Sequence, residues 1–256
     1  MAGMTVIECA GSPLEMGRAH GEQARPVVRR ALEARREVTA RPGVAGLLTR
    51  SGVAGLLTRS PLLGTVRRLM PGLADELRGV AEGAGVPFED VAAYNWMDEG
   101  WWTRRRHLRE HGCSVVGGQP AGGPYLAQNM DLPAFMDGSQ LVLLLRPQDG
   151  PEQQVLTSAG LLALTGVNAA GVAVCVNTLA MLSGDPYGLP VAAVIRGVLA
   201  SRDRAAAVTC PICVPGAPEW PTRTFGSVVY ELGPAPRTRI RPGLPGRAQW
   251  LEPGWR

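Results

Sequence analysis

The hydrophobic pattern of this chain changes its period close to residue 113, and this change constrains the fold more than any other feature. Before it, apolar residues recur three or four positions apart, as in the helical spacing of Leu69, Leu73 and Leu77. After it, short apolar runs alternate with Gly, Pro and Asn, as in YLAQNMD, LVLLLRP and GVAVCVN, a pattern typical of antiparallel strands. Helices followed by groups of strands favour an α+β layered fold over a parallel α/β fold.

A first helix is expected from Ser12 to about Thr39. Ser12 can cap this helix, Pro13 suits its first position and Glu15 completes a capping box. The helical pattern also predicts helices at 62–84, ended by Gly83 and Gly85, near 88–96 and at 190–200, and FGSVVYEL predicts a final strand.

Length and composition predict one soluble domain, residues 1–256. Of the 256 residues 45% are hydrophobic and 19% charged, so the chain has the composition of a folded globular protein. Residues 43–51 are repeated unchanged at 52–60, which we interpret as an apolar insert, because two short copies cannot build a solenoid. The start of the chain lacks the pattern of a signal peptide, and the five cysteines form no regular framework. We therefore expect a cytoplasmic protein with reduced thiols.

A glycine and a cysteine stand at the point where the pattern changes. Gly112 follows a polar, basic stretch that is typical of an exposed connector, and Cys113 begins the first predicted strand. Gly112 tolerates the strained backbone that is needed for the thiol of Cys113 to attack the preceding carbonyl. After such a cleavage Cys113 carries a free α-amino group, whose pKa of about 8 makes it a usable base for its own thiol. The pair therefore predicts self-cleavage after Gly112.

Three polar residues are candidates to support Cys113. The turn GGQPAGG predicts a hairpin that brings residues near Gln128 roughly opposite Cys113, with Asp131 about three residues beyond. The carboxylate of Asp131 can then orient the ammonium group, and Asn129 supplies a further polar side chain. Asn168 follows another predicted strand. It can donate to an oxyanion or stabilise its own turn, and the sequence leaves both alternatives open.

Several segments together carry a family resemblance, in order and over about four-fifths of the chain. They are GSPLEMGRAHG, ELRGVAEGAG with YNWMDE, GCS at 112–114, GGPYLAQNMD, TSAGLLALTGVNAAGVAVCVN, GLPVAAVIRGVLAS and SVVYEL. Through them the chain resembles the acyl-CoA:6-aminopenicillanic acid acyltransferase family of N-terminal-nucleophile (Ntn) hydrolases.

The resemblance implies a four-layer αββα sandwich and a precursor cut into segments 1–112 and 113–256 that stay associated. It also implies transfer or hydrolysis of an acyl group from a small acyl amide or acyl-CoA, without metal or cofactor. Carried over to this sequence, Cys113 is the nucleophile, Asp131 its partner and Asn168 an oxyanion-hole donor. Between 190–200 and the final strand the family has further strands and a second oxyanion asparagine, where this chain has TCPICVPGAPEWP. The sandwich is therefore expected to be incomplete.

Other interpretations compete with this one. A shortened chain can be a catalytically inactive family member. The arginine run at 104–109 can bind nucleic acid, although a short charge run is usually a solvated face. His107 and His111 suggest a dyad with Cys113, but surface positions in a connector are the simpler interpretation. Cys210 and Cys213 form a lone CxxC pair, which is a weak indication of zinc. Neither nucleic acid nor a membrane is expected as a partner.

Overall fold

The computed structural model describes residues 5–40, 61–97, 99, 114–118, 121, 124–130, 132–176, 187–202, 226–231, 237–242 and 249. The helices are α1 (Pro13–Gln23), α2 (Arg25–Ala40), α5 (Leu62–Leu69), α6 (Pro71–Ala84), α7 (Phe88–Asn95) and α9 (Val191–Leu199), with a 3-10 turn η1 (Ala134–Met136). The strands are β1 (Thr5–Gly11), β2 (Ser114–Gly118), β3 (Tyr125–Asn129), β4 (Gln140–Pro147), β5 (Gln153–Ser158), β6 (Thr165–Asn168), β7 (Ala173–Val174), β8 (Gly226–Glu231) and β9 (Arg237–Pro242).

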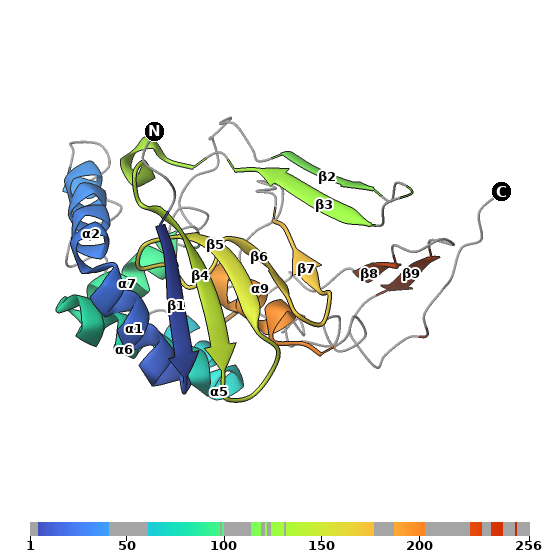
Figure 1. Ribbon diagram of the computed structural model, residues 1–256, viewed down its shortest axis with the longest axis horizontal. Helices are drawn as coiled ribbons and strands as arrows, with labels where there is room; N and C mark the ends of the chain where they lie inside the picture. The colour runs from blue at the N-terminus through green and yellow to red at the C-terminus, as the bar shows by residue number, and fades with distance from the viewer. Residues whose placement is uncertain are drawn as a thin grey trace.

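A five-stranded sheet with the order β1-β4-β5-β6-β7 forms the centre of the molecule (Figure 1). Strands β4 to β7 pair antiparallel with their neighbours, as the sequence predicts. Strand β1, which no sequence pattern predicted, pairs parallel to β4. The protein is thus a mixed structure of helices and a mixed sheet, which agrees with the expected α+β class.

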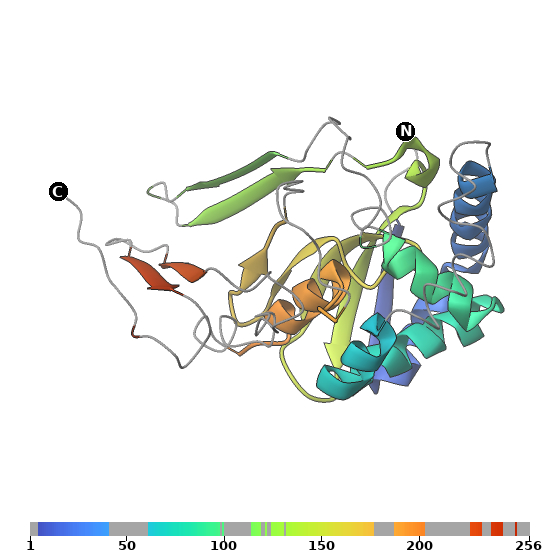
Figure 2. The same cartoon turned by 180° about the vertical axis from the view of Figure 1, so that it is seen from behind.

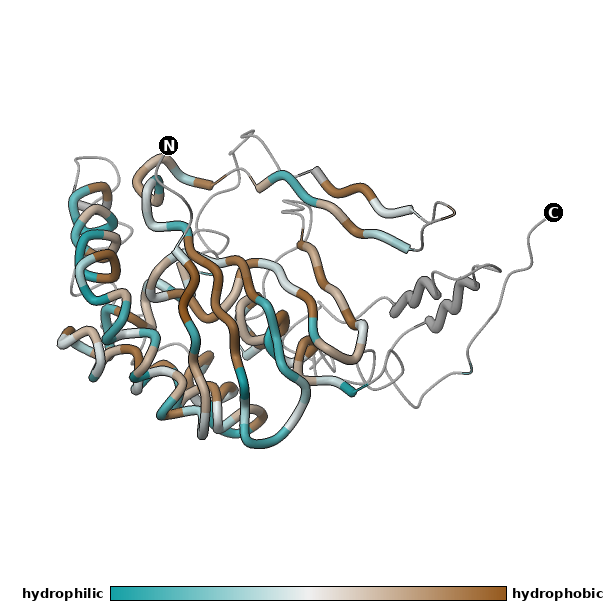
Figure 3. Tube along the Cα trace, in the orientation of Figure 1, coloured by the Kyte–Doolittle hydropathy of each residue, from teal (hydrophilic) through white to brown (hydrophobic). Residues whose placement is uncertain are grey.

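One face of this sheet is buried beneath the helices. Ile7, Leu143 and Val155 point into the core from β1, β4 and β5, and each is at most 2% exposed. The view from behind shows α1, α5, α6 and α9 in front of this face (Figure 2). The opposite face also carries apolar side chains, and Val6 is 57% exposed there and Val167 40%. The central strands are therefore rich in apolar residues, as the brown stretches of the trace show (Figure 3).

Two further pairs of strands are separate from the central sheet. The β2–β3 hairpin and the β8–β9 pair are each a two-stranded antiparallel sheet. Strand β2 begins one residue after Cys113 and β8 lies within the predicted segment FGSVVYEL, so both strand predictions are confirmed. The described residues thus show a helical layer and a sheet with two separate strand pairs. The full four-layer sandwich stays a prediction.

Two predicted helices are each divided in two. The capping box at Ser12 and Glu15 starts α1 as predicted, but the helix stops at Gln23. Pro26 has no N–H to continue the helical ladder, and α2 begins again at Arg25. Pro71 likewise starts α6 as a new helix after α5. Proline therefore sets both breaks, at positions where the spacing of apolar residues alone predicts a continuous helix.

Helices α1 and α6 cross at a distance that admits only glycine at four positions. A Cβ built on Gly79 would lie 2.3 Å from the carbonyl oxygen of Leu14, and one on Gly21 would lie 2.3 Å from that of Val80. A Cβ built on Gly17 or Gly83 would overlap backbone atoms in the same way. Gly83 was expected to end the helix; it lies inside α6 instead, and Gly85, with a φ of 63°, is the C-cap.

Candidate functional site

A cleft of about 550 Å³ lies next to the β2–β3 hairpin. Its walls come from β3, from the segment between β3 and β4 with η1, and from β5 and the chain before β6. The lining residues are Gln128, Asn129, Met130, Leu132, Pro133, Ala134, Met136, Asp137, Gln140, Leu156, Thr157 and Leu164. Most of these side chains are apolar, and none is basic. The cleft therefore suits a largely neutral ligand that carries an apolar group.

The register of the hairpin sets which residues adjoin this cleft. Ser114 lies opposite Asn129, and Val115 lies opposite Gln128. This register agrees with the predicted hairpin, in which residues near Gln128 return roughly opposite the start of the first strand. Gly112, Cys113 and Asp131 lie outside the described residues. Their chain neighbours Asn129 and Met130 line the cleft, and Ser114 pairs with Asn129.

Gln128 links the hairpin to the central sheet. Its Nε2 donates a hydrogen bond to the backbone carbonyl oxygen of Val176, which follows β7. Its Oε1 is buried and accepts no hydrogen bond in the described part of the chain. A buried acceptor without a donor costs free energy.

Asn168 is the only predicted catalytic side chain within the described residues, and it is fully hydrogen-bonded. Its Nδ2 donates to the carbonyl oxygens of Leu199 and Ser201, each at 2.8 Å. Its Oδ1 accepts from the N–H groups of Ala170 and Val172 at 3.0 and 2.9 Å. Both amide hydrogens are therefore in use, and the side chain holds the β6–β7 turn against the end of α9.

The position of Asn168 agrees with this structural role. It pairs with Gln153, whereas Thr157, which lines the cleft, lies four residues further along β5. Four residues of strand span roughly 13 Å. Of the two alternatives that the sequence left open, the geometry supports the one in which Asn168 stabilises its turn.

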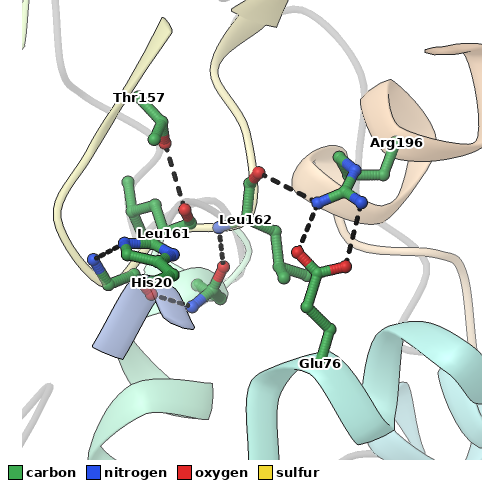
Figure 4. A network of polar contacts seen from close by, with 8 residues as sticks. His20, Glu76, Thr157, Leu161, Leu162 and Arg196 are labelled. Atoms are coloured by element: carbon green, nitrogen blue, oxygen red, sulfur yellow. Dashed lines mark hydrogen bonds and ion pairs between the residues drawn. The ribbon is translucent and has the colours of Figure 1, made fainter. Parts of the chain in front are cut away.

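A buried polar cluster, which no sequence pattern predicted, lies behind the sheet (Figure 4). The guanidinium of Arg196 in α9 binds the carboxylate of Glu76 in α6 through two hydrogen bonds of 2.6 and 2.9 Å. Beside it, Nε2 of His20 accepts a hydrogen bond of 3.0 Å from the N–H of Gly160. Both charged residues of the pair are at most 4% exposed. Helical periodicity gave no signal, because a charged residue on a buried helix face breaks the pattern.

Burial and the charges of this cluster shift the pKa values of two side chains. Burial, and then the charge of Arg196, lowers the pKa of His20 to about 4. Because Nε2 of His20 accepts, the neutral ring carries its proton on Nδ1. Burial, and then the carboxylate of Glu76, raises the pKa of Cys9 to about 12. The Cys9 thiol is therefore protonated at neutral pH, and this cysteine is excluded as a nucleophile.

The remaining motifs of the sequence lie outside the described residues. These are the arginine run at 104–109, the two histidines at 107 and 111 and the pair Cys210 and Cys213. Within the ranges that the structure describes, no three His, Cys, Asp or Glu side chains gather where they could hold a metal ion. The helices described there are also too short or too polar to cross a membrane.

Comparison with known proteins shows a similarity to an acyltransferase. The chain is 25% identical over 198 residues to the 40 kDa form of acyl-coenzyme A:6-aminopenicillanic-acid acyltransferase from Emericella nidulans. The match covers 77% of this chain and 54% of the fungal protein, so the chain spans about half the length of that relative. No family model matches the sequence. The similarity shows a distant relationship to this acyltransferase.

Proposed function

We propose that this chain is a cysteine amide hydrolase or acyltransferase of the Ntn type, which cleaves itself between Gly112 and Cys113. The main observation in support is the pairing of Ser114 with Asn129, a residue that lines the cleft. This register joins the residue after Cys113 to the strand that leads into Asp131. The distant relationship to an acyltransferase supports the same reaction class.

The proposed reaction needs only groups that this sequence supplies. The thiol of Cys113 loses its proton to the α-amino group and attacks the acyl carbon of a small acyl amide or acyl-CoA. The tetrahedral intermediate collapses to a thioester at Cys113, and the amine or thiol leaves with the proton. Water or a second amine then attacks the thioester, the C–S bond breaks to release the acid or the new amide, and the proton of the attacking group returns to the thiol of Cys113. Asp131 is proposed to orient the ammonium group, and Asn129 to support it.

Contacts between the segments before and after the cleavage position should keep the two fragments associated. Strand β1 from the first segment pairs along its full length with β4 of the second. The buried pair Glu76–Arg196 and the bond between His20 and Gly160 also cross from one segment to the other. Such buried contacts are lost only on unfolding, so we expect no separation of the fragments under native conditions.

Intact-protein mass spectrometry tests the proposal. We expect two fragments divided at the Gly112–Cys113 bond in the wild type and an uncut chain for Cys113→Ala. Cys175→Ala is a matched control, because Cys175 is another cysteine of the second segment, half-buried beside Thr165. It should cleave like the wild type. A folded wild-type chain with an uncut backbone at this junction would refute the proposal.

The second candidate is a shortened, catalytically inactive relative. It is favoured by the match itself, which covers only 54% of the fungal acyltransferase, and by the amide of Asn168, whose two hydrogens are already hydrogen-bonded. An uncut chain without thiol-dependent turnover of acyl amides would support it.

Nucleic-acid binding through the arginine run predicts affinity that falls steeply with salt, and absence of binding at low salt excludes it.

A further inference from the structure

We infer that a buried hydroxyl relay, made of Tyr94, Ser158 and Ser139, positions the cleft wall at residues 132–137 to receive the apolar acyl group of a substrate. The inference rests on the proposed function and deepens it, because it names a neutral acyl chain as the part of the substrate that the cleft recognises. The three relay residues are at most 2% exposed, so they act through the wall and not by contact with the substrate.

Residues 132–137, which include η1, form a largely apolar wall. They supply five of the twelve lining residues of the cleft, namely Leu132, Pro133, Ala134, Met136 and Asp137. Leu156 from β5 and Leu164 before β6 add further apolar surface. An apolar chain complements such a lining, provided that the wall is held in place before the ligand arrives.

Directed hydrogen bonds join this wall to the helical layer. The hydroxyl of Ser139 donates to the carbonyl oxygen of Met136, which can only accept. Because each hydroxyl has one proton, Ser139 accepts from Ser158 at 2.6 Å. Ser158 in turn accepts from Tyr94 at 2.8 Å. Burial raises the pKa of Tyr94, which therefore keeps the proton that it donates at neutral pH. The relay thus runs from α7 through the end of β5 to the last residue of η1.

Backbone contacts fix the residues that follow the wall. The N–H of Ala159 donates to the carbonyl oxygen of Ser139 at 2.8 Å. The guanidinium of Arg30 in α2 donates to the carbonyl oxygen of Gly138 at 2.5 Å. Neither Gly138 nor Ser139 lines the cleft. The position of the wall therefore depends on residues outside the lining.

Loss of a relay hydroxyl should place the wall correctly in a smaller fraction of molecules. Ser139→Ala removes the donor to Met136 and leaves the proton of Ser158 without its acceptor. Two lost hydrogen bonds shift an equilibrium by roughly thirtyfold. The apparent affinity for an acyl chain falls with the fraction of molecules in which the wall is in place.

The test measures the binding of octanol, a neutral molecule with an apolar chain that the proposed reaction cannot cleave. Isothermal titration calorimetry on the whole protein should give a dissociation constant that is up to about tenfold higher for Ser139→Ala than for the wild type. The increase should be smaller for Tyr94→Phe, which keeps the ring and loses only the outermost bond of the relay.

Ser201→Ala is the matched control. The hydroxyl of Ser201 also donates to a backbone carbonyl, that of Gly197, and neither residue lines the cleft. Its octanol affinity should equal that of the wild type. With an octanoyl anilide as substrate, the two relay variants should raise KM and leave kcat unchanged, because the wall is in place once the acyl chain is bound.

Two results would overturn the inference. One is a wild-type protein that does not bind octanol. The other is wild-type octanol affinity in Ser139→Ala and Tyr94→Phe despite a lower melting temperature, which would leave the relay a purely structural feature. Failure of the proposed function is a separate result, an uncut wild-type chain, and the octanol measurement does not depend on it.

Discussion

Replacing Gly79 by alanine should force α1 and α6 apart. A Cβ at this position would lie 2.3 Å from the carbonyl oxygen of Leu14 and 2.8 Å from the backbone nitrogen of Arg18. Ordinary contacts of a carbon atom are roughly 3.5 Å, so the helices must separate by about 1 Å. Both obstructing atoms belong to the backbone of a helix, and no side-chain rotation relieves the overlap.

The expected destabilisation follows from two opposing contributions. Overpacking in a close interface costs typically about 1–3 kcal/mol, and the rigid backbone on the other side places this site at the upper end. Alanine recovers about 1 kcal/mol, because it is the better helix former. We therefore expect Gly79→Ala to lower the free energy of unfolding by about 2 kcal/mol.

Gly64 provides the matched control. It lies exposed in α5, and a Cβ there would meet no atom within 4 Å. Gly64→Ala should therefore raise the free energy of unfolding by up to about 1 kcal/mol. Urea unfolding followed by circular dichroism measures both variants against the wild type. If Gly79→Ala were as stable as the wild type, the close crossing of α1 and α6 would be refuted.

Two further perturbations address the buried polar groups. The pKa of His20 is lowered to about 4, so the unfolded chain binds a proton at this residue before the folded chain does as the pH falls. The free energy of unfolding at pH values above 6.5 should therefore fall by up to about 3 kcal/mol as the pH drops to 4. Urea unfolding at pH 7, 5 and 4 should show this loss, and a His20→Gln variant with the same pH dependence would contradict it. Asn168→Ala removes four hydrogen bonds and should lower the free energy of unfolding by roughly 3 kcal/mol; unchanged thermal stability with lost turnover would instead identify a purely catalytic asparagine.

The sequence predicted the elements whose signals are local. The capping box at Ser12, the left-handed Gly85 and the alternating strands from β4 to β7 all depend on residues close together in the chain. Strand β1 escaped prediction because its seven residues include Glu8 and Cys9 and its partner β4 lies far along the chain. Its parallel pairing is a tertiary contact that no local pattern reports.

The candidate site was predictable only in part, for the same physical reason. The glycine-rich turn predicted the hairpin but fixed its register only to within a residue or two, because the register depends on the geometry of the turn. The side chain of Asn168 donates to the carbonyl oxygens of Leu199 and Ser201, which lie more than 30 residues away, so no local pattern could predict these contacts. These long-range hydrogen bonds favour the structural alternative of the two that the sequence had left open.

The buried pair Glu76–Arg196 gives the strongest reason to expect that a cut chain would keep its shape. Removing one member of such a pair is costly, because the other charge is left in a medium of low polarity. Separation of segments 1–112 and 113–256 would leave both charges without partners and would also strip β1 from β4. The backbone bond before Cys113 adds nothing to these contacts. Self-cleavage would therefore change the chemistry at one terminus while the ion pair between α6 and α9 stays intact.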